Sequence, residues 1–282
     1  MKRFLSAACV LAFSAAVLAQ EADSTTVTTT TRAGGFDSIG ELWSFEDAVP
    51  LCTGRVDLRL TGAWSTASAP ANLGDSSDDY VIQPSLVWGV AENLELSANV
   101  PVWVGDAGDR PGGLDGNADT NVGLLWRFME QDGGWPAMAL SAHGRFPTGD
   151  NSSGVDGELR LIMTNDYDSC IRSHINLFGI TVNGNDSRDG RDVGDTRDFQ
   201  WGAVIGLDGP LCSDGAVRWV VDYLHRSSFH NGQGNINLVD VGWEWSMGSG
   251  NGLGMSFQVG LDRSGETPNF GATVTYSMAL VQ

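Results

Sequence analysis

The residues best suited by type and spacing to do chemistry are Ser141 and His143, two positions apart in ALSAHGRFPTGD (residues 139–150). If this stretch is extended, both side chains point to one face, as a nucleophile and its general base must. No third polar residue completes a lipase-like arrangement, and the chain contains neither G-x-S-x-G nor H-E-x-x-H. We therefore expect no enzyme activity and no catalytic residue, and interpret His143 as part of a polar network near Arg145.

Two acidic stretches have the ligand chemistry of a calcium site. NGNDSRDGRDVGDTRD (residues 183–198) carries a carboxylate at every third position, and DGNAD spans residues 115–119. Neither continues into the twelve-residue calcium loop, which needs glycine at position six and glutamate at position twelve. We predict solvated acidic loops, with no metal site and no cofactor. Calcium, or divalent bridging to lipid headgroups, is the alternative, and its candidate ligands are Asp115, Asp119, Asp186, Asp189 and Asp192.

A further set of charged residues alternates with apolar residues along several segments. In an extended chain the charged side chains share one face and the apolar side chains share the other. If the charged face lines a lumen, cations set against acids could form a selectivity ring, or could pair and close the lumen. The candidates are Arg55, Arg59, Glu95, Arg127, His143, Arg145, Glu158 and Arg160.

The elements that must position these residues follow a period of two. LELSANVPVWV (residues 94–104) has an apolar residue at every second position, the pattern typical of a β-strand. Such segments follow one another from residue 54 to the end of the chain, and we count twelve. They span residues 55–64, 80–90, 94–104, 120–129, 137–146, 155–164, 172–182, 199–207, 216–224, 237–246, 253–262 and 270–280.

A soluble β-sandwich and a transmembrane barrel both alternate in this way. The connections after odd strands are mostly long and polar, and those after even strands are mostly compact, which favours the barrel. Aromatic residues near the strand ends, such as Trp88 and Trp126, fit interface girdles. We predict an all-β, twelve-stranded antiparallel outer-membrane barrel with short periplasmic turns and longer outer loops. A secreted sandwich is the alternative, and Pro84 and Pro101 are expected to mark bulges or lie near a rim.

The N-terminal residues predict export. MKRFLSAACVLAFSAAVLA (residues 1–19) has a basic start, an apolar stretch and a small-residue cleavage site, as signal peptides do. We interpret residues 20–52 as a flexible segment, with a short helix before Pro50 or a plug, and residues 53–282 as the barrel. The formal net charge of −19 argues against nucleic acid as a partner, since nucleic acid is held mainly by Lys and Arg.

Three cysteines remain after residue 19, and an odd number excludes a fully paired disulfide framework. Cys170 and Cys212 both fall in turns at the predicted periplasmic end. A disulfide between Cys170 and Cys212 is therefore a hypothesis for this oxidising compartment.

Several stretches resemble the outer-membrane transporter family known as "meta-pathway of phenol degradation". They are QPSLVWGVAENLELSANVPV (residues 83–102), NVGLLWRF (121–128), ALSAHGRFPTGD (139–150) and PLCTGRVDLRL (50–60). The resemblance covers about residues 50–282. It implies a barrel of this size in the outer membrane of a Gram-negative-type bacterium, and it supplies no agreed binding residues.

The C-terminal segment is similar to the signal by which the barrel-assembly machinery recognises its substrates. The matching residues are Asn269, Gly271, Val274 and Tyr276. The segment departs from that signal because it ends in LVQ rather than in an aromatic residue.

These observations lead to an expected function. We expect a pore or transporter for small solutes, hydrophobic or aromatic ones by the resemblance, with outer-membrane lipid and the barrel-assembly machinery as partners. The first alternative is a plugged barrel with a structural or surface-interaction role, and a barrel-embedded hydrolase is a distant one. Twelve strands lie between the filled eight-stranded barrels and the open channels of about 16–18 strands, so strand number does not choose between them.

Overall fold

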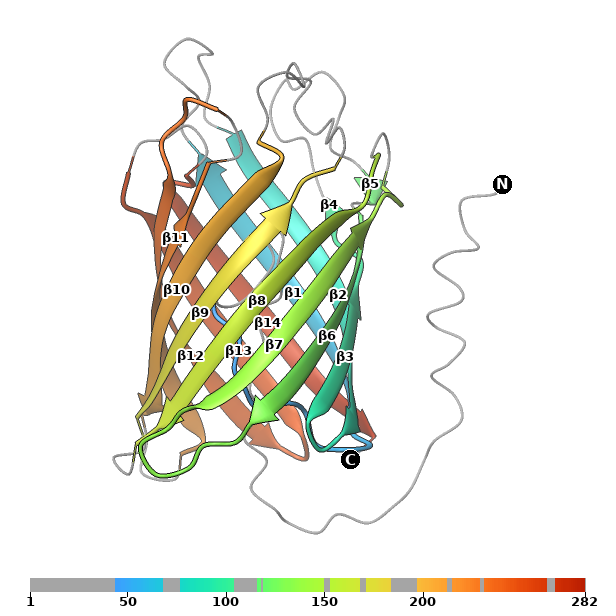
Figure 1. The fold of residues 1–282 in the computed structure, drawn as a ribbon, viewed down its shortest axis with the longest axis vertical. Helices are drawn as coiled ribbons and strands as arrows, with labels where there is room; N and C mark the ends of the chain where they lie inside the picture. The colour runs from blue at the N-terminus through green and yellow to red at the C-terminus, as the bar shows by residue number, and fades with distance from the viewer. Residues whose placement is uncertain are drawn as a thin grey trace.

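The computed structural model describes residues 44–67, 77–103, 116–117, 119–149, 153–167, 171–183, 197–211, 215–228, 231–262 and 267–281. Fourteen antiparallel strands form one continuous sheet within these ranges. Since β1 pairs with both β2 and β14, the sheet closes into a barrel (Figure 1). The strands are β1 (Val56–Ala67), β2 (Ser77–Ala91), β3 (Leu94–Asn99), β4 (Val102–Trp103), β5 (Gly116–Asn117), β6 (Thr120–Met129), β7 (Ala137–Phe146), β8 (Asp156–Asp166), β9 (Arg172–Thr181), β10 (Phe199–Pro210), β11 (Val217–Arg226), β12 (Ile236–Gly248), β13 (Asn251–Gly260) and β14 (Phe270–Val281).

The strands place apolar side chains outside and polar side chains inside. Leu159 and Ile205 point outward and are 59% and 57% exposed, whereas Asp57 and Asn176 point inward and are both 0% exposed. This is the distribution expected of a wall that faces hydrocarbon on one side and a polar lumen on the other. With β4 and β5 limited to two residues each, twelve strands form the wall. The prediction of a twelve-stranded antiparallel barrel is confirmed, and the sandwich alternative is wrong.

The two ends of the barrel differ in the length of their connections. Residues 92–93 join β2 to β3, and residues 249–250 join β12 to β13. Ser249 and Gly250 both have positive φ, 50° and 71°, as a tight hairpin turn requires. At the other end, residues 182–198 join β9 to β10. We call the short-turn end, where β1 starts and β14 finishes, the periplasmic end, and the opposite end the outer end.

Two prolines accompany the interruption of the third wall strand: Pro101 lies within it, and Pro84 lies opposite it in β2. The sequence predicts one strand over residues 94–104, but the structure divides it into β3 and β4. The Val100 N–H donates to the Pro84 carbonyl at 3.2 Å, and Pro84 has no N–H to return. Pro101 lies next in the chain and also lacks a donor. The register of β1 with β2 is unshifted at Pro84, so the predicted bulge is absent there and the ladder is broken instead.

Residues 44–55 run inside the barrel before β1 begins, as the blue trace within the lumen shows (Figure 1). They contain bends and a turn but no helix, so the helix predicted before Pro50 is absent from this part. No helix of the described residues is long and apolar enough to cross a membrane.

The segment turns into β1 against Gly89 of β2. A Cβ at Gly89 would lie 2.1 Å from the Cys52 carbonyl oxygen, so only glycine permits this close approach. The Gly54 N–H donates to the Gly89 carbonyl at 2.7 Å, and Gly54 has a φ of 83°. These two glycines allow the chain to leave the lumen and enter the wall within a few residues.

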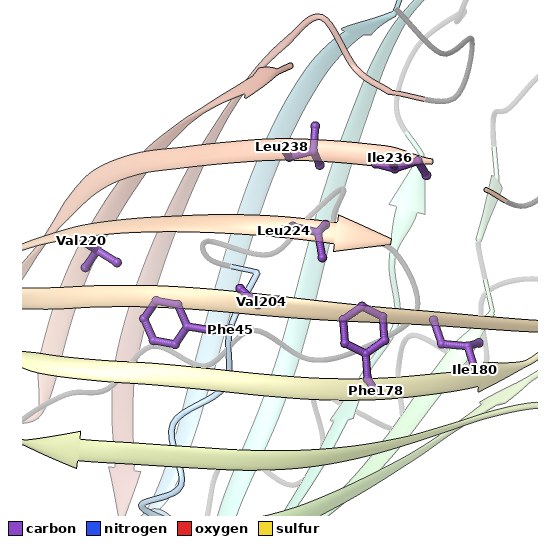
Figure 2. Close-up of a cluster of buried hydrophobic side chains, with 8 residues drawn as sticks. All are labelled: Phe45, Phe178, Ile180, Val204, Val220, Leu224, Ile236 and Leu238. Carbon is purple, nitrogen blue, oxygen red and sulfur yellow. The ribbon is translucent and has the colours of Figure 1, made fainter. Parts of the chain in front are cut away.

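Part of the lumen is lined by apolar side chains from β9 to β12, which we call the apolar lining (Figure 2). Phe45, from the segment inside the barrel, packs against it. The apolar lining consists of Phe178, Ile180, Val204, Val220, Leu224, Ile236 and Leu238. Both apolar and polar side chains are therefore buried inside the barrel.

Candidate functional site

The candidate site lies in the lumen, where residues 44–51, here called the luminal segment, contact side chains of the strands. The Ser44 N–H donates to Asp222 Oδ2 at 3.1 Å, and its hydroxyl donates to Asp240 Oδ2 at 2.8 Å. Asp222 and Asp240 lie directly opposite each other on β11 and β12. Arg160 Nη1 donates to the Ser44 carbonyl at 3.0 Å. Both backbone groups of Ser44 are thus bound by the barrel.

The next contacts hold the backbone at every second residue. The Glu46 N–H donates to Asn176 Oδ1 at 2.6 Å, and Asn176 Nδ2 donates to the Glu46 carbonyl at 3.0 Å. The Ala48 N–H donates to Thr164 Oγ1 at 3.0 Å. Backbone groups buried away from water need such partners, and here side chains provide them in place of a neighbouring strand. The Leu51 N–H donates to Glu95 Oε2 at 2.8 Å. We call the side chains that bind the segment the cradle; they are Glu95, Arg160, Thr164, Asn176, Asp222 and Asp240, with His143 and Arg172 described next.

Two acidic side chains of the luminal segment are also bound. Glu46 Oε1 lies 2.9 Å from His143 Nε2, and Asp47 Oδ2 accepts a hydrogen bond from Arg172 Nη1 at 2.7 Å. Arg172 Nη2 donates to Asp208 Oδ2 at 2.7 Å, which ties the segment to β10 as well. Removing one partner of such a buried pair leaves the other charge uncompensated, which is strongly unfavourable.

His174 joins these contacts into one network. Its Nδ1 lies 3.1 Å from Thr164 Oγ1 and its Nε2 lies 2.9 Å from Asp208 Oδ2. Because Asp208 is an acceptor, this pattern assigns the ring proton to Nε2, and the Thr164 hydroxyl then donates to Nδ1. The Ala48 N–H donates to the same Thr164 oxygen, so the hydroxyl proton stays available to donate to His174.

Phe45 occupies a seat between His174 and Gly206. Its ring stacks on the His174 ring with a centroid distance of 4.2 Å and an interplanar angle of 16°. A Cβ on Gly206 would lie 2.6 Å from Phe45 Cδ1, so this position of β10 leaves room for the ring only as glycine. Figure 2 shows Phe45 among the side chains of the apolar lining.

The two histidine arrangements differ from a hydrolytic centre. Ser141 Oγ lies 3.2 Å from His143 Nε2, but Glu46 reaches the same nitrogen, whereas a triad places nucleophile and acid on opposite nitrogens. Thr164 and Asp208 do lie on opposite nitrogens of His174. That set is buried beneath the luminal segment: Thr164 is 3% exposed and His174 is 0% exposed.

Seven of the eight predicted lumen residues are inside the barrel, but they do not form one ring. Arg55 Nε donates to Asp57 at 2.7 Å near the periplasmic end, and Arg160 Nε donates to Glu158 at 2.9 Å farther along the lumen. Arg145 Nε donates to Asp156 at 2.9 Å towards the outer end. The others inside are Arg59 and Glu95, both buried, and His143.

Arg127 is the exception among the predicted lumen residues. It lies at the periplasmic rim, where its Nη2 donates to Glu130 Oε1 at 2.8 Å and to the Glu92 carbonyl at 3.3 Å. Glu130 is mostly exposed. Arg127 therefore stabilises the turn between β6 and β7 and stands apart from the luminal segment.

Three of the predicted lumen residues, Glu95, His143 and Arg160, contact the luminal segment. Sequence reasoning missed the other residues that contact it. Asp222 and Asp240 stand on the polar faces of two predicted strands, so their inward orientation was available from the period of two. Arg172 and Asn176 lie on a strand whose alternation is irregular, and nothing in the pattern singles them out. Asp47 lies in a stretch without periodicity.

Among the acidic calcium candidates, Asp119 contacts other groups of the protein, and the rest lie outside the residues that the structure describes. Asp119 Oδ1 accepts from the Gly149 N–H at 3.0 Å, and Asp119 Oδ2 lies 3.8 Å from Arg145 Nε. Within the described ranges, no group of three or more His, Cys, Asp or Glu could hold a metal ion. The positions outside the described residues are Asp115, Asp186, Asp189, Asp192, Cys170 and Cys212.

Comparison with known proteins shows likeness at the level of structure. No protein-family model matches the chain, and no curated protein matches it. The COG4313 outer membrane channel from Pseudomonas putida F1 is 16% identical, with a TM-score of 0.64 over 83% of this chain and 98% of that one. The NanC porin is 12% identical, with a TM-score of 0.55 over 78% of this chain and 97% of that one. At these identities the likeness is one of fold, and that fold is the outer-membrane β-barrel.

Proposed function

We propose that this protein is an outer-membrane channel for small solutes whose luminal segment narrows the path. The observation that carries the proposal is a polar lumen in which the segment is held by side chains rather than by strand pairing. Side-chain contacts can open locally without disrupting the wall, whereas a paired strand could not leave without opening the barrel. The segment is thus suited to control passage.

We propose apolar or aromatic molecules as the solutes. The resemblance to the phenol meta-pathway family implies this class. The apolar lining and the Phe45 seat support it, because an aromatic ring gains free energy on leaving water for such a surface.

A plugged barrel with a structural role is the second candidate. It is favoured by the buried pairs Arg55–Asp57, Arg145–Asp156 and Arg160–Glu158, which place bulky charged side chains in the lumen. In that case the luminal segment would be a permanent part of the core.

Single-channel recording in planar bilayers separates the two candidates. We compare the wild-type protein with a triple variant, Phe45→Ala, Glu46→Ala and Asp47→Ala, which removes the side-chain anchors of the segment. We expect discrete current steps whose conductance is several-fold larger in the triple variant, because the constriction is weakened. Silence from both proteins, verified as folded barrels by heat-modifiable gel migration, would favour the plug and contradict the channel.

We also propose that residues 1–19 direct export and that the barrel-assembly machinery inserts the chain into the outer membrane through β14. The strand closes the barrel by pairing with β1 and β13, so its recognition would precede closure. Tyr276→Ala should lower the amount of folded barrel in outer-membrane fractions severalfold. Met278→Ala, on the same outward face, is the matched control, and equal loss from both variants would argue against the signal.

A further inference from the structure

The cradle binds the luminal segment in the way that a neighbouring strand would. Its backbone contacts fall on Ser44, Glu46 and Ala48, which is every second residue, and a further contact joins Glu95 to the Leu51 N–H. In an antiparallel sheet, a residue in a hydrogen-bonded position likewise uses both its N–H and its carbonyl, at every second position. The luminal segment therefore presents backbone groups, between bends at residue 44 and residues 48–49, to side chains of β8, β9, β11 and β12.

Among the cradle residues, Asn176 most closely resembles a peptide group of a neighbouring strand. Its side-chain amide accepts from the Glu46 N–H and donates to the Glu46 carbonyl, so it acts as one peptide group of a missing strand. Asn176 is 0% exposed, and its Oδ1 also accepts from Arg160 Nη1 at 3.2 Å. Arg160 in turn binds the Ser44 carbonyl. These contacts recognise a peptide backbone whatever its side chains.

Three neighbouring sites of the cradle also select the side chains of the segment that is bound. The Gly206 and His174 seat takes an aromatic ring, His143 takes the first acidic side chain, and Arg172 takes the second. Ionic hydrogen bonds to buried groups are the stronger contacts of such a site. An aromatic residue followed by two acidic residues fits all three.

We infer that the cradle is a peptide-binding site, occupied in cis by Phe45-Glu46-Asp47, and that short extended peptides with an aromatic-acidic-acidic core can occupy it in trans. The inference rests on the proposed function, since a peptide must enter the lumen through the channel. It adds a second ligand class to the proposed apolar or aromatic solutes: peptides in which two acidic residues follow an aromatic one.

The test uses the synthetic peptide WSFEDAV (residues 43–49), acetylated, amidated and fluorescently labelled. Its binding to the full-chain protein in detergent is followed by fluorescence anisotropy. We expect the triple variant Phe45→Ala, Glu46→Ala and Asp47→Ala to bind the peptide at least tenfold more tightly than the wild-type protein, whose cradle is occupied. Adding Gly206→Val to the triple variant should abolish binding, because the new side chain fills the Phe45 seat.

A matched peptide tests the backbone contacts. N-methylation at the Ser44, Glu46 and Ala48 positions removes the three donors and keeps every side chain. Each lost hydrogen bond should weaken binding by roughly threefold to tenfold. Equal binding of the methylated and unmethylated peptides would overturn backbone recognition.

Failure of this inference can be distinguished from failure of the channel proposal. A triple variant that conducts ions but does not bind the peptide shows a channel whose segment is only a cis constriction, and the inference is then wrong. Peptide binding without ion current would support the site and contradict the channel. If the triple variant does not give heat-modifiable barrels, Phe45→Ala alone replaces it, with the same expected direction and the same overturning result.

Discussion

At the scale of the residue, the packing of the luminal segment depends on one glycine as much as on the charged side chains of the lumen. Gly206 leaves the space that Phe45 fills, and Phe45 stacks on a histidine whose two nitrogens are both engaged. The luminal segment is therefore seated by shape at Phe45 and by hydrogen bonds at its neighbours.

The shape of this seat gives the first prediction. Gly206→Val should displace Phe45 at a cost of about 1–3 kcal/mol, typical of overpacking, and should favour release of the segment by on the order of tenfold. We expect a larger mean single-channel conductance in planar bilayers. Gly62→Val, at an outward position of β1 with nothing within 4 Å of its Cβ, is the control and should conduct like the wild type. Unchanged conductance in a folded Gly206→Val barrel would show that Phe45 does not restrict the path.

At the scale of the element, the third wall strand is the weak part of the barrel. β3 has six residues, whereas β2 has fifteen and β6 has ten. The ladder is interrupted where Pro84 accepts from Val100 without returning a hydrogen bond, and it resumes at Ile82 and Val102. One hydrogen bond of the ladder is therefore missing at this point.

Completing the ladder should stabilise the barrel. Pro84→Val supplies an N–H opposite the Val100 carbonyl and keeps an apolar side chain on the outer surface. We expect a gain of about 1 kcal/mol, seen as a higher temperature for the loss of folded migration on gels. Leu86→Val, on the same face of β2, changes only the side chain and serves as control. A lower temperature for Pro84→Val would mean that the backbone break is needed by the native wall.

At the scale of the whole molecule, the lumen carries an excess of acid. The buried charged side chains of the described residues comprise five arginines and ten carboxyl groups. Including the half-buried Arg172, Arg218 and Glu244 gives seven cations and eleven acids. A pore with such a lining prefers small cations to small anions, whereas the acidic side chains of a bound peptide meet His143 and Arg172 in the cradle.

The open channel should therefore prefer potassium over chloride. The preference is measured as the reversal potential in a KCl gradient, and it should fall as acidification protonates the carboxylates. Asp222→Asn with Asp240→Asn should reduce it, while Glu130→Gln, mostly exposed at the periplasmic rim, should leave it unchanged. An anion preference in the wild-type protein would contradict this account of the lumen.

The sequence alone determined the wall of this protein. A period of two is a local property, so it identified the twelve wall strands and assigned Leu159 to the outer surface and Glu158 to the lumen before any contact was known. The long and short connections then oriented the barrel. The ends of several strands differ from the prediction by two or three residues, as at β1 and β10. Only the third strand was wrongly predicted as continuous, because the effect of Pro101 depends on the strand that it faces.

The tertiary structure alone decided what fills the lumen. Ser44 meets Asp240 across 196 positions of sequence, and Glu46 meets Asn176 across 130. Residues 44–51 show no periodicity, because their backbone is satisfied by side chains rather than by a strand ladder. The order of residues along the chain does not encode which distant side chains meet them. Closure of the barrel brings those side chains together, and it is closure that makes the luminal segment a site.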